Sequence, residues 1–365
     1  MKTLQEQILI NFSDGPKVEV LGNKSGNYKI EFIDKSTNKV VHNSTIKSNM
    51  WTKCNKKWNI PWLIRINNQD KFDFNLAGKN VRVRLESKSV GDTLAWTPQI
   101  IEFANLYKCN VTLSTFHNEW FENLPAYKDI KFVSPGTEGK YYAEYKIGWF
   151  MVDDKWDEGN YHPKQPNTIP LIQTATDILG LPYKEINHGI DFKPKLKPMP
   201  SKYICIGPKS TAGLKEWPAH YWERLAKLLN DKGYQVINIS YEGFSCKGVI
   251  DRKELNWEDT YNYLYHADLF IGLGSGLSWF NWAMGKHTVM INNFIPYGYE
   301  FTHNLTKVED YSVCNNCWVD PRHQFNKGKW NWCPRHQNTL SEHICHKALK
   351  PEIVFEKVMQ VLKFK

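Results

Sequence analysis

Four cysteines near the C-terminus form a metal-ligating pattern in this 365-residue chain. Cys314 and Cys317 are arranged as C-x2-C, and Cys333 and Cys345 follow in the same segment. Four thiolates in tetrahedral array suit zinc or iron, and a closed site of this kind is structural. Three nearby histidines offer an imidazole in place of one thiolate: His336, His343 and His346. The remaining cysteines are scattered and are interpreted as buried or incidental thiols: Cys54, Cys109, Cys205 and Cys246.

A lysine stands next to a predicted phosphate-binding loop in the second half of the chain. The loop at 210–213 follows a strand predicted over 203–207, and Lys215 precedes a helix predicted over 218–232. Small hydroxyl side chains, amide N–H groups at a helix N-terminus and a cation favour a diphosphate ligand. Ser210, Thr211 and Lys215 are therefore candidate ligands, although an exposed loop lysine gives the same local pattern.

A glycine-rich turn follows a second buried strand, predicted over 269–271. Its residues, Gly272-Leu273-Gly274-Ser275-Gly276, run directly into a helix predicted over 277–284. Glycine lets the backbone approach a phosphate closely, and Ser275 adds a hydroxyl. A tight strand-to-helix turn also needs glycine for packing. The spacing departs from the dinucleotide fingerprint G-x-G-x-x-G, which disfavours an NAD-binding function.

The elements that carry these residues predict two α/β halves. Strand and helix patterns alternate over 81–116, with a helical segment at 94–107, and again over 203–291. This alternation predicts parallel sheets, with a ligand in the cleft between two Rossmann-like domains. Residues 193–201 hold three prolines and no helical period, and are predicted to be a linker.

The predicted domain boundaries come from these changes in pattern. Short alternating strands separated by Gly- and Asn-rich turns predict an antiparallel N-terminal module. The boundaries are 1–75 for this β module, 76–197 for the first Rossmann-like domain with a hairpin insertion at 132–156, 198–350 for the second domain including the cysteine segment 314–345, and 351–365 for a closing helix.

Composition narrows the class of protein. Hydrophobic residues make up 41% of the chain and aromatic residues 14%, which excludes intrinsic disorder as the main state. The formal charge is +9, but acidic residues are interleaved with the lysines, which does not favour nucleic acid as a partner. The uncharged stretch 269–285 is too short and polar for a membrane helix, and Glu6 interrupts any apolar leader. We expect a cytoplasmic protein, where clustered cysteines favour metal over disulfides.

Three stretches resemble the bacterial autotransporter strand-loop-strand O-heptosyltransferases, which are GT-B glycosyltransferases of the heptosyltransferase type. Lys215-Glu216-Trp217-Pro218 and Ser275-Gly276-Leu277 are similar to the Lys-x-Trp-Pro and Ser/Thr-Gly-Leu segments that hold the donor diphosphate there. Residues 89–96, Ser-Val-Gly-Asp-Thr-Leu-Ala-Trp, resemble the family stretch Leu-Gly-Asp-Thr-Ile-Ala-Trp. With the β-rich N-terminus and the cysteine cluster, the resemblance covers roughly residues 15–362.

The resemblance implies catalytic roles for particular residues. Asp92 would be the base that takes a proton from the acceptor hydroxyl, although an Asp before an apolar helix is also a common N-cap. Lys215 and the turn Ser275-Gly276-Leu277 would offset charge on the departing nucleotide diphosphate in a single, inverting displacement, with no catalytic divalent metal. Glu242 would lie near the donor ribose, and a solvated loop carboxylate is its alternative interpretation.

The resemblance also implies a bound metal, and at one position this chain differs from the family pattern. In the family the cysteine segment binds iron, so iron is expected at Cys314, Cys317, Cys333 and Cys345, with zinc as the alternative. Where relatives outside the autotransporter group often have His after Gly-Leu-Ser, this chain has Trp279. That difference limits what the family implies about contacts to the donor sugar.

The function implied is heptose transfer from ADP-heptose to serine hydroxyls of an autotransporter-like passenger protein, by an enzyme that assembles into large rings. The 15 Trp and 18 Tyr fit sugar stacking, a core or an oligomer interface. The same fold could instead use another nucleotide sugar or another acceptor, such as lipopolysaccharide, a different glycan or a modified nucleic-acid base. A non-catalytic carbohydrate- or nucleotide-binding protein and a redox role for the cysteines are the remaining alternatives.

Overall fold

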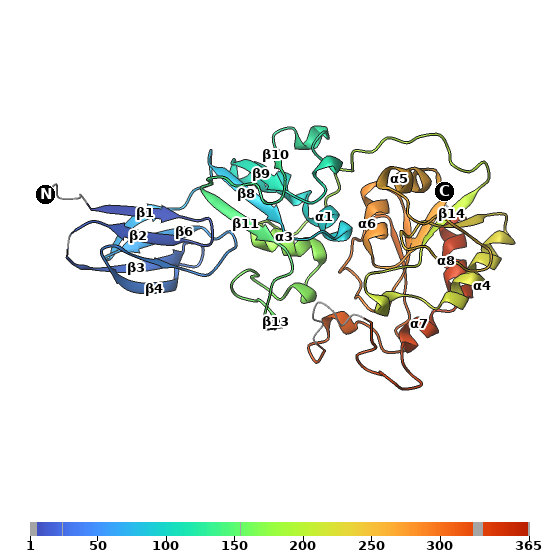
Figure 1. Ribbon diagram of the computed structural model, residues 1–365. Coiled ribbons are helices and arrows are strands. Elements are labelled where there is room, and N and C mark those ends of the chain that lie inside the picture. Colours follow the sequence, from blue (N-terminus) through green and yellow to red (C-terminus); the bar gives the residue numbers. More distant parts are fainter. Residues whose placement is uncertain (1–5, 24, 154, 324–330, 364–365) are drawn as a thin grey trace. The chain divides into compact units, whose positions relative to one another are not determined.

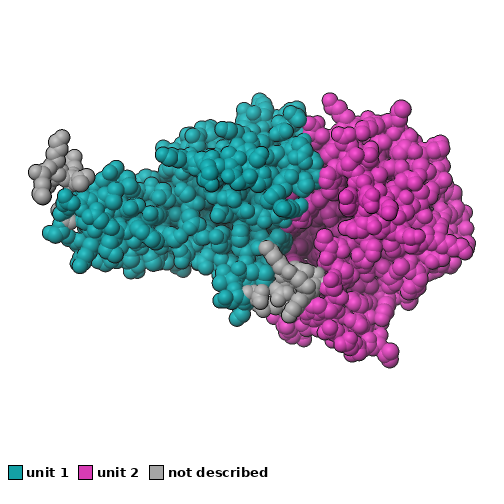
Figure 2. Space-filling model, in the orientation of Figure 1, with its two compact units in different colours: residues 1–88, 96–169, 173–184 teal, residues 89–95, 170–172, 185–365 magenta. Residues whose placement is uncertain are grey.

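The computed structural model describes residues 6–23, 25–153, 155–323 and 331–363 (Figure 1). The chain divides into two compact units (Figure 2). The first unit comprises 1–88, 96–169 and 173–184, and the second comprises 89–95, 170–172 and 185–365. The residues 89–95, which contain Asp92, are therefore grouped with the second unit although they come directly after a strand of the first.

The first unit begins with two antiparallel sheets, as expected for an N-terminal β module. One sheet has the order β1-β2-β5 and the other β4-β3-β6-β7. Every second side chain in β2 and in the first half of β3 is buried, so one face of each strand packs inward. The strands are β1 (Gln7–Asn11), β2 (Lys17–Leu21), β3 (Asn27–Asp34), β4 (Lys39–Lys47), β5 (Met50–Lys53), β6 (Trp62–Ile66) and β7 (Gln69–Asp73).

A four-stranded parallel sheet with the order β10-β9-β8-β11 completes the first unit. Its strands are β8 (Asn80–Leu85), β9 (Asn110–Ser114), β10 (Lys131–Val133) and β11 (Ala143–Ile147). Between β8 and β9 the helical segment forms two helices, α1 (Val90–Trp96) and α2 (Gln99–Tyr107), because Pro98 between them has no amide N–H for a continuous ladder. The pair β12 (Met151–Val152) and β13 (Lys155–Trp156) is antiparallel, and α3 (Leu171–Leu179) comes next along the chain.

The second unit is built on a six-stranded sheet in which every pairing is parallel, and its order is β16-β15-β14-β17-β18-β19. Counted along the chain this is 3-2-1-4-5-6, the doubly wound arrangement, whose strand order reverses between β14 and β17. The strands are β14 (Tyr203–Gly207), β15 (Gln235–Asn238), β16 (Val249–Asp251), β17 (Leu269–Gly272), β18 (Thr288–Ile291) and β19 (Leu305–Val308).

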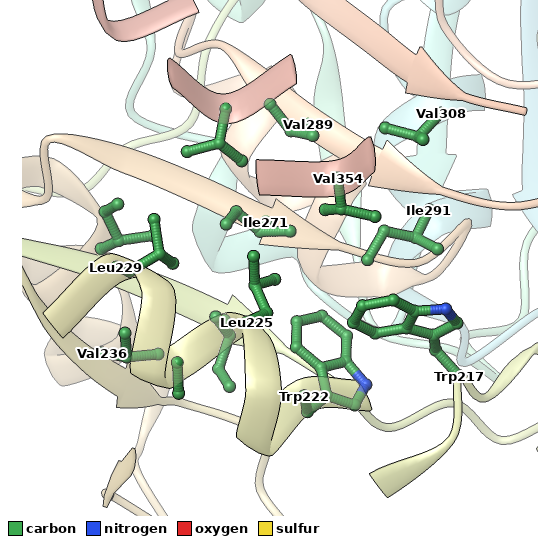
Figure 3. Close-up of a cluster of buried hydrophobic side chains, with 14 of the residues drawn as sticks. Trp217, Trp222, Leu225, Leu229, Val236, Ile271, Val289, Ile291, Val308 and Val354 are labelled. Carbon is green, nitrogen blue, oxygen red and sulfur yellow. The ribbon is translucent and has the colours of Figure 1, made fainter. Parts of the chain in front are cut away.

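Helices and a continuous apolar core support this sheet. The helices are α4 (Ala219–Asn230), α5 (Trp257–His266), α6 (Gly276–Ala283), α7 (Ile344–Ala348) and α8 (Pro351–Lys363). Figure 3 shows Trp217 and Trp222 beside Leu225 of α4, Ile271 of β17 and Val354 of α8. Short 3-10 turns occur at Asn118–Trp120, Pro125–Tyr127, Pro166–Thr168, Gly213–Lys215 and Cys317–Val319. Within the described chain, no helix combines the length and apolarity needed to span a bilayer.

Candidate donor-binding and catalytic site

The two predicted phosphate loops leave neighbouring strands at the point where the strand order reverses. β14 ends at Gly207 and β17 ends at Gly272, and these two glycines are paired across the sheet. A Cβ on Gly272 would lie 2.6 Å from the Phe270 ring and 2.9 Å from the Ser278 hydroxyl. This glycine is therefore required by packing. Ligands in open α/β sheets bind outside the strand ends at such a switch point.

Lys215 joins the two loops directly. Its Nζ donates a hydrogen bond to the carbonyl oxygen of Gly274 at 2.7 Å. Dehydration of the ammonium group lowers the pKa of Lys215, while the carboxylates of Glu300 and Asp92 act in the opposite direction. A cation short of water and close to a helix N-terminus is well suited to a phosphate, which would replace the missing hydration.

The hydroxyl residues of the loops differ in their surroundings. The Ser210 Oγ accepts a hydrogen bond from the amide of Ala212 at 3.2 Å, so it shapes its own loop. Thr211 is exposed. Ser275 lies at the N-cap of α6, but its side chain makes no capping hydrogen bond. Gly276 and Leu277 are the first two residues of α6, and both are half-buried.

Asp92 lies near Lys215 and the glycine-rich loop, within the same compact unit. It is the third residue of α1, inside the first turn and not at its N-cap, and it is 7% exposed. Reciprocal glycines bring α1 and α6 together: a Cβ on Gly276 would lie 3.0 Å from Val90, and one on Gly91 would lie 3.0 Å from the Trp279 ring. This close packing places the Asp92 carboxylate where it influences the pKa of Lys215.

The structure adds polar residues that the sequence patterns did not reveal. Glu300 is 6% exposed and accepts a hydrogen bond from the indole N–H of Trp279. Burial raises the pKa of Tyr299 well above its ordinary value, and Glu300 and Asp92 act in the same direction. Asn292 shapes this loop, because its Oδ1 accepts hydrogen bonds from the amides of Phe294 at 2.9 Å and Ile295 at 3.2 Å. No local motif marks Glu300, since its indole partner lies 21 residues away in the sequence.

Glu242 is not part of this group in the structure. It lies after β15 in an exposed turn, and no described contact links it to Lys215 or Asp92. Its assignment to the donor ribose therefore still rests on the resemblance alone.

The four clustered cysteines lie close enough to influence one another. Burial, reinforced by the neighbouring thiols, raises the pKa of Cys345 to about 12. Burial likewise raises the pKa of Cys317 to about 11, and Arg335 opposes this effect. All eight cysteines are free thiols. Across the described ranges, however, no three or more His, Cys, Asp or Glu side chains are grouped so that they could hold a metal ion.

Known proteins resemble both the sequence and the fold. Residues 169–241 match the model of glycosyltransferase family 9 (heptosyltransferase). The chain is 26% identical to an inactive autotransporter heptosyltransferase of Burkholderia thailandensis, BimC, over 95% of this chain and 84% of that protein. It is also 26% identical to the autotransporter heptosyltransferase TibC of Escherichia coli, over 94% of this chain and 87% of that protein.

A crystal structure shows the same fold. It contains TibC, described as a dodecameric iron-containing heptosyltransferase in complex with ADP-D-beta-D-heptose. The TM-score is 0.83 at 24% identity, covering 97% of this chain and 96% of that chain. The predicted α/β fold with parallel sheets and the predicted family resemblance are confirmed.

Proposed function

Since this chain is a glycosyltransferase similar over nearly its whole length to the autotransporter heptosyltransferases, we propose that it transfers heptose from ADP-heptose to serine hydroxyls of an autotransporter-type protein. The observation that carries the proposal is the hydrogen bond from Lys215 to Gly274, with Asp92 beside it. That contact joins both donor loops and the candidate base in one place.

The residues divide the reaction between them. Asp92 takes the proton from the serine hydroxyl as its oxygen attacks the anomeric carbon of the sugar. The bond to the diphosphate breaks on the opposite face, so the configuration at the anomeric carbon inverts. Lys215 and the N-terminal turn of α6 receive the negative charge that develops on ADP, and this lowers the barrier without a divalent metal.

Nucleotide release tests the proposal. The purified protein is incubated with ADP-heptose, ADP-glucose, UDP-glucose or GDP-mannose, with and without an autotransporter passenger fragment. The expected result is ADP release that requires both ADP-heptose and the passenger. Release from another nucleotide sugar would change the assigned donor, and release that requires a glycan or a nucleic acid would change the assigned acceptor. In both cases the protein would still be a glycosyltransferase.

A second candidate function is nucleotide-sugar binding without transfer, because one of the similar proteins is described as inactive. Binding of ADP-heptose with no release of ADP under any acceptor condition would favour this candidate. The presence of a buried carboxylate at Asp92 favours the catalytic function.

We further propose that Cys314, Cys317, Cys333 and Cys345 bind one structural iron. The donor chemistry fits, since the four thiols are near one another, but the described side chains are not gathered into a ligating group. Metal analysis of anaerobically purified protein is expected to give one iron per chain, lost together with several degrees of melting temperature in Cys317→Ser. Cys246→Ser, outside the cluster, is the control and should retain the metal. Stoichiometric zinc would reassign the ion.

The proposal includes a homo-oligomer and a cytoplasmic location. The TibC structure is dodecameric, and eight free thiols fit a reducing compartment. Light scattering coupled to size-exclusion chromatography measures the assembly, and a monomer at micromolar concentration would contradict it.

A further inference from the structure

A buried glutamate connects the two functional groups of the site. Glu300 lies on the loop between β18 and β19 and is 6% exposed. One carboxylate oxygen accepts the indole N–H of Trp279, and the other lies against Gly274, where an added Cβ would meet it at 2.8 Å. A carboxylate this deeply buried requires a hydrogen-bond donor, and the Trp279 indole supplies one here.

The indole extends this connection to the candidate base. Trp279 is 2% exposed and its ring lies against Gly91, where a Cβ would be 3.0 Å from the Cδ1 atom. Gly91 directly precedes Asp92. The indole that donates to Glu300 therefore packs directly against the first turn of α1.

Charge connects Glu300 to the lysine. Glu300 and Asp92 are the carboxylates that raise the pKa of Lys215 against its dehydration. The other groups facing Glu300 are Lys307, whose Nζ also contacts Glu309 at 2.6 Å, and the phenol of Tyr299. The Glu300 carboxylate therefore acts electrostatically on two ammonium groups, and one of them belongs to Lys215, whose dehydration favours loss of its proton.

We propose that Glu300 is a positioning residue that orients Asp92 through the Trp279 indole and keeps Lys215 charged to receive the donor diphosphate. The proposal rests on the proposed function for the transfer step, but its effect on Lys215 can be measured by ADP binding alone. It also explains why a tryptophan comes after Gly-Leu-Ser in this chain: the indole N–H is the donor that the buried carboxylate needs.

The chain contains a matched control pair one turn further along α6. Trp282 donates its indole N–H to Glu185 at 3.0 Å, and Glu185 also accepts the amide of Thr302 at 2.8 Å. The Glu185 side chain is 7% exposed. The carboxylates that act on the pKa of Lys215 are those of Glu300 and Asp92. The Glu185→Gln variant therefore removes the charge of a buried carboxylate that accepts an indole N–H, as Glu300→Gln does, but it leaves the carboxylates that act on Lys215 in place.

The first test measures ADP binding by calorimetry as a function of pH in the full-length protein. In Glu300→Gln the amide oxygen still accepts the indole N–H, but the negative charge is lost. The pKa of Lys215 falls, so the pH above which ADP binding weakens is expected to drop by about one unit relative to wild type. Glu185→Gln should leave this pH dependence unchanged. An unchanged profile in a folded Glu300→Gln variant, or an equal shift in Glu185→Gln, would overturn the proposal.

The second test uses the transfer reaction to separate the two proposed effects of Glu300, which are the positioning of Asp92 through Trp279 and the charge effect on Lys215. Trp279→Phe keeps a ring against Gly91 but removes the donor to Glu300, so kcat is expected to fall about tenfold with little change in the KM for ADP-heptose. The alkaline limb of kcat/KM should move to lower pH in Glu300→Gln and stay in place in Trp279→Phe. A rise in KM alone for both variants would contradict positioning of the base. If the wild-type protein transfers no heptose but Glu300→Gln still shifts the pH dependence of ADP binding, the proposed function is rejected. The effect of Glu300 on Lys215 would then still stand.

Discussion

The two parallel sheets of this protein share a strand order and differ in the side chains that fill them. The sheet of the first unit runs β10-β9-β8-β11, and four neighbouring strands of the second unit's sheet, counted from one edge, run β16-β15-β14-β17. Numbered along the chain, both read 3-2-1-4. In each, the segment after the first strand leads to a functional candidate, Asp92 after β8 and Lys215 after β14.

The interiors of the two sheets differ in polarity. In the first unit, Arg82 of β8 is paired across the sheet with Glu144 of β11, and the two side chains form a buried ion pair. In the second unit, β14 and β17 are apolar throughout and end in paired glycines. The same topology thus supports a charged sheet in one unit and, in the other, a sheet whose glycine ends leave the backbone open to a ligand.

The largest expected effect comes from Asp92→Asn. The amide cannot take a proton, so transfer should fall by about 10³-fold while ADP binding is retained. Initial rates of ADP release and calorimetric titration with ADP measure the two quantities. Equal loss of both would mean that Asp92 supports the fold of the donor loop and is not the base.

Lys215→Ala should have the next largest effect, on both binding and transfer. Loss of the cation removes the charge that meets the diphosphate, and transfer is expected to fall about 10²-fold with weaker ADP binding. Lys209→Ala is the control, since Lys209 belongs to the same loop but pairs with Glu216 at 3.0 Å. A comparable loss in the Lys209 variant would show that the loop responds to its total charge only.

Glu144→Gln tests the polar sheet of the first unit. The variant leaves the buried guanidinium of Arg82 without its carboxylate, and the free energy of unfolding is expected to fall by about 2–3 kcal/mol. ADP binding should be unchanged, because the donor loops belong to the second unit. Chemical denaturation measures the loss, with Glu86→Gln at a more exposed pair as control. Weakened ADP binding would show that the two units are energetically coupled.

Gly274→Ala tests the glycine end of the second sheet and should have the smallest effect. The new methyl group would lie 2.7 Å from the side-chain amide nitrogen of Asn292 and 2.8 Å from Glu300. Displacement of these side chains is expected to weaken ADP binding about tenfold. Gly26→Ala, where no atom lies within 4 Å, is the neutral control. Unchanged binding in Gly274→Ala would mean that the loop adapts and that the glycine is not needed for close approach.

Local sequence patterns were sufficient for the features that depend on neighbours along the chain. The strands before both loops, the glycine turn and the alternating strands and helices of the α/β halves are all features of short segments with strong periodicity or distinctive residues. The break at Pro98 could also have been predicted, since proline inside a helical pattern interrupts it. It divides the segment predicted over 94–107 into two helices.

Features that depend on tertiary packing were beyond local patterns. Glu300 carries no motif, and its importance arises only when the loop after β18 folds back against α6. From the sequence, Trp279 stood out only because related proteins often have His at this place after Gly-Leu-Ser. Its hydrogen bond to Glu300 could be seen only in the structure. For the cysteines, spacing predicts a metal, but the side chains of the described residues are not grouped so that they could hold one.

The most direct test of the central claim is the mass of an autotransporter passenger fragment after incubation with the wild-type protein and ADP-heptose, with ADP measured in the same samples. We predict heptose additions on serine residues that match the ADP released, and no addition with Asp92→Asn. Tight binding of ADP-heptose with neither ADP release nor a mass change on the passenger would contradict heptose transfer to protein by this chain.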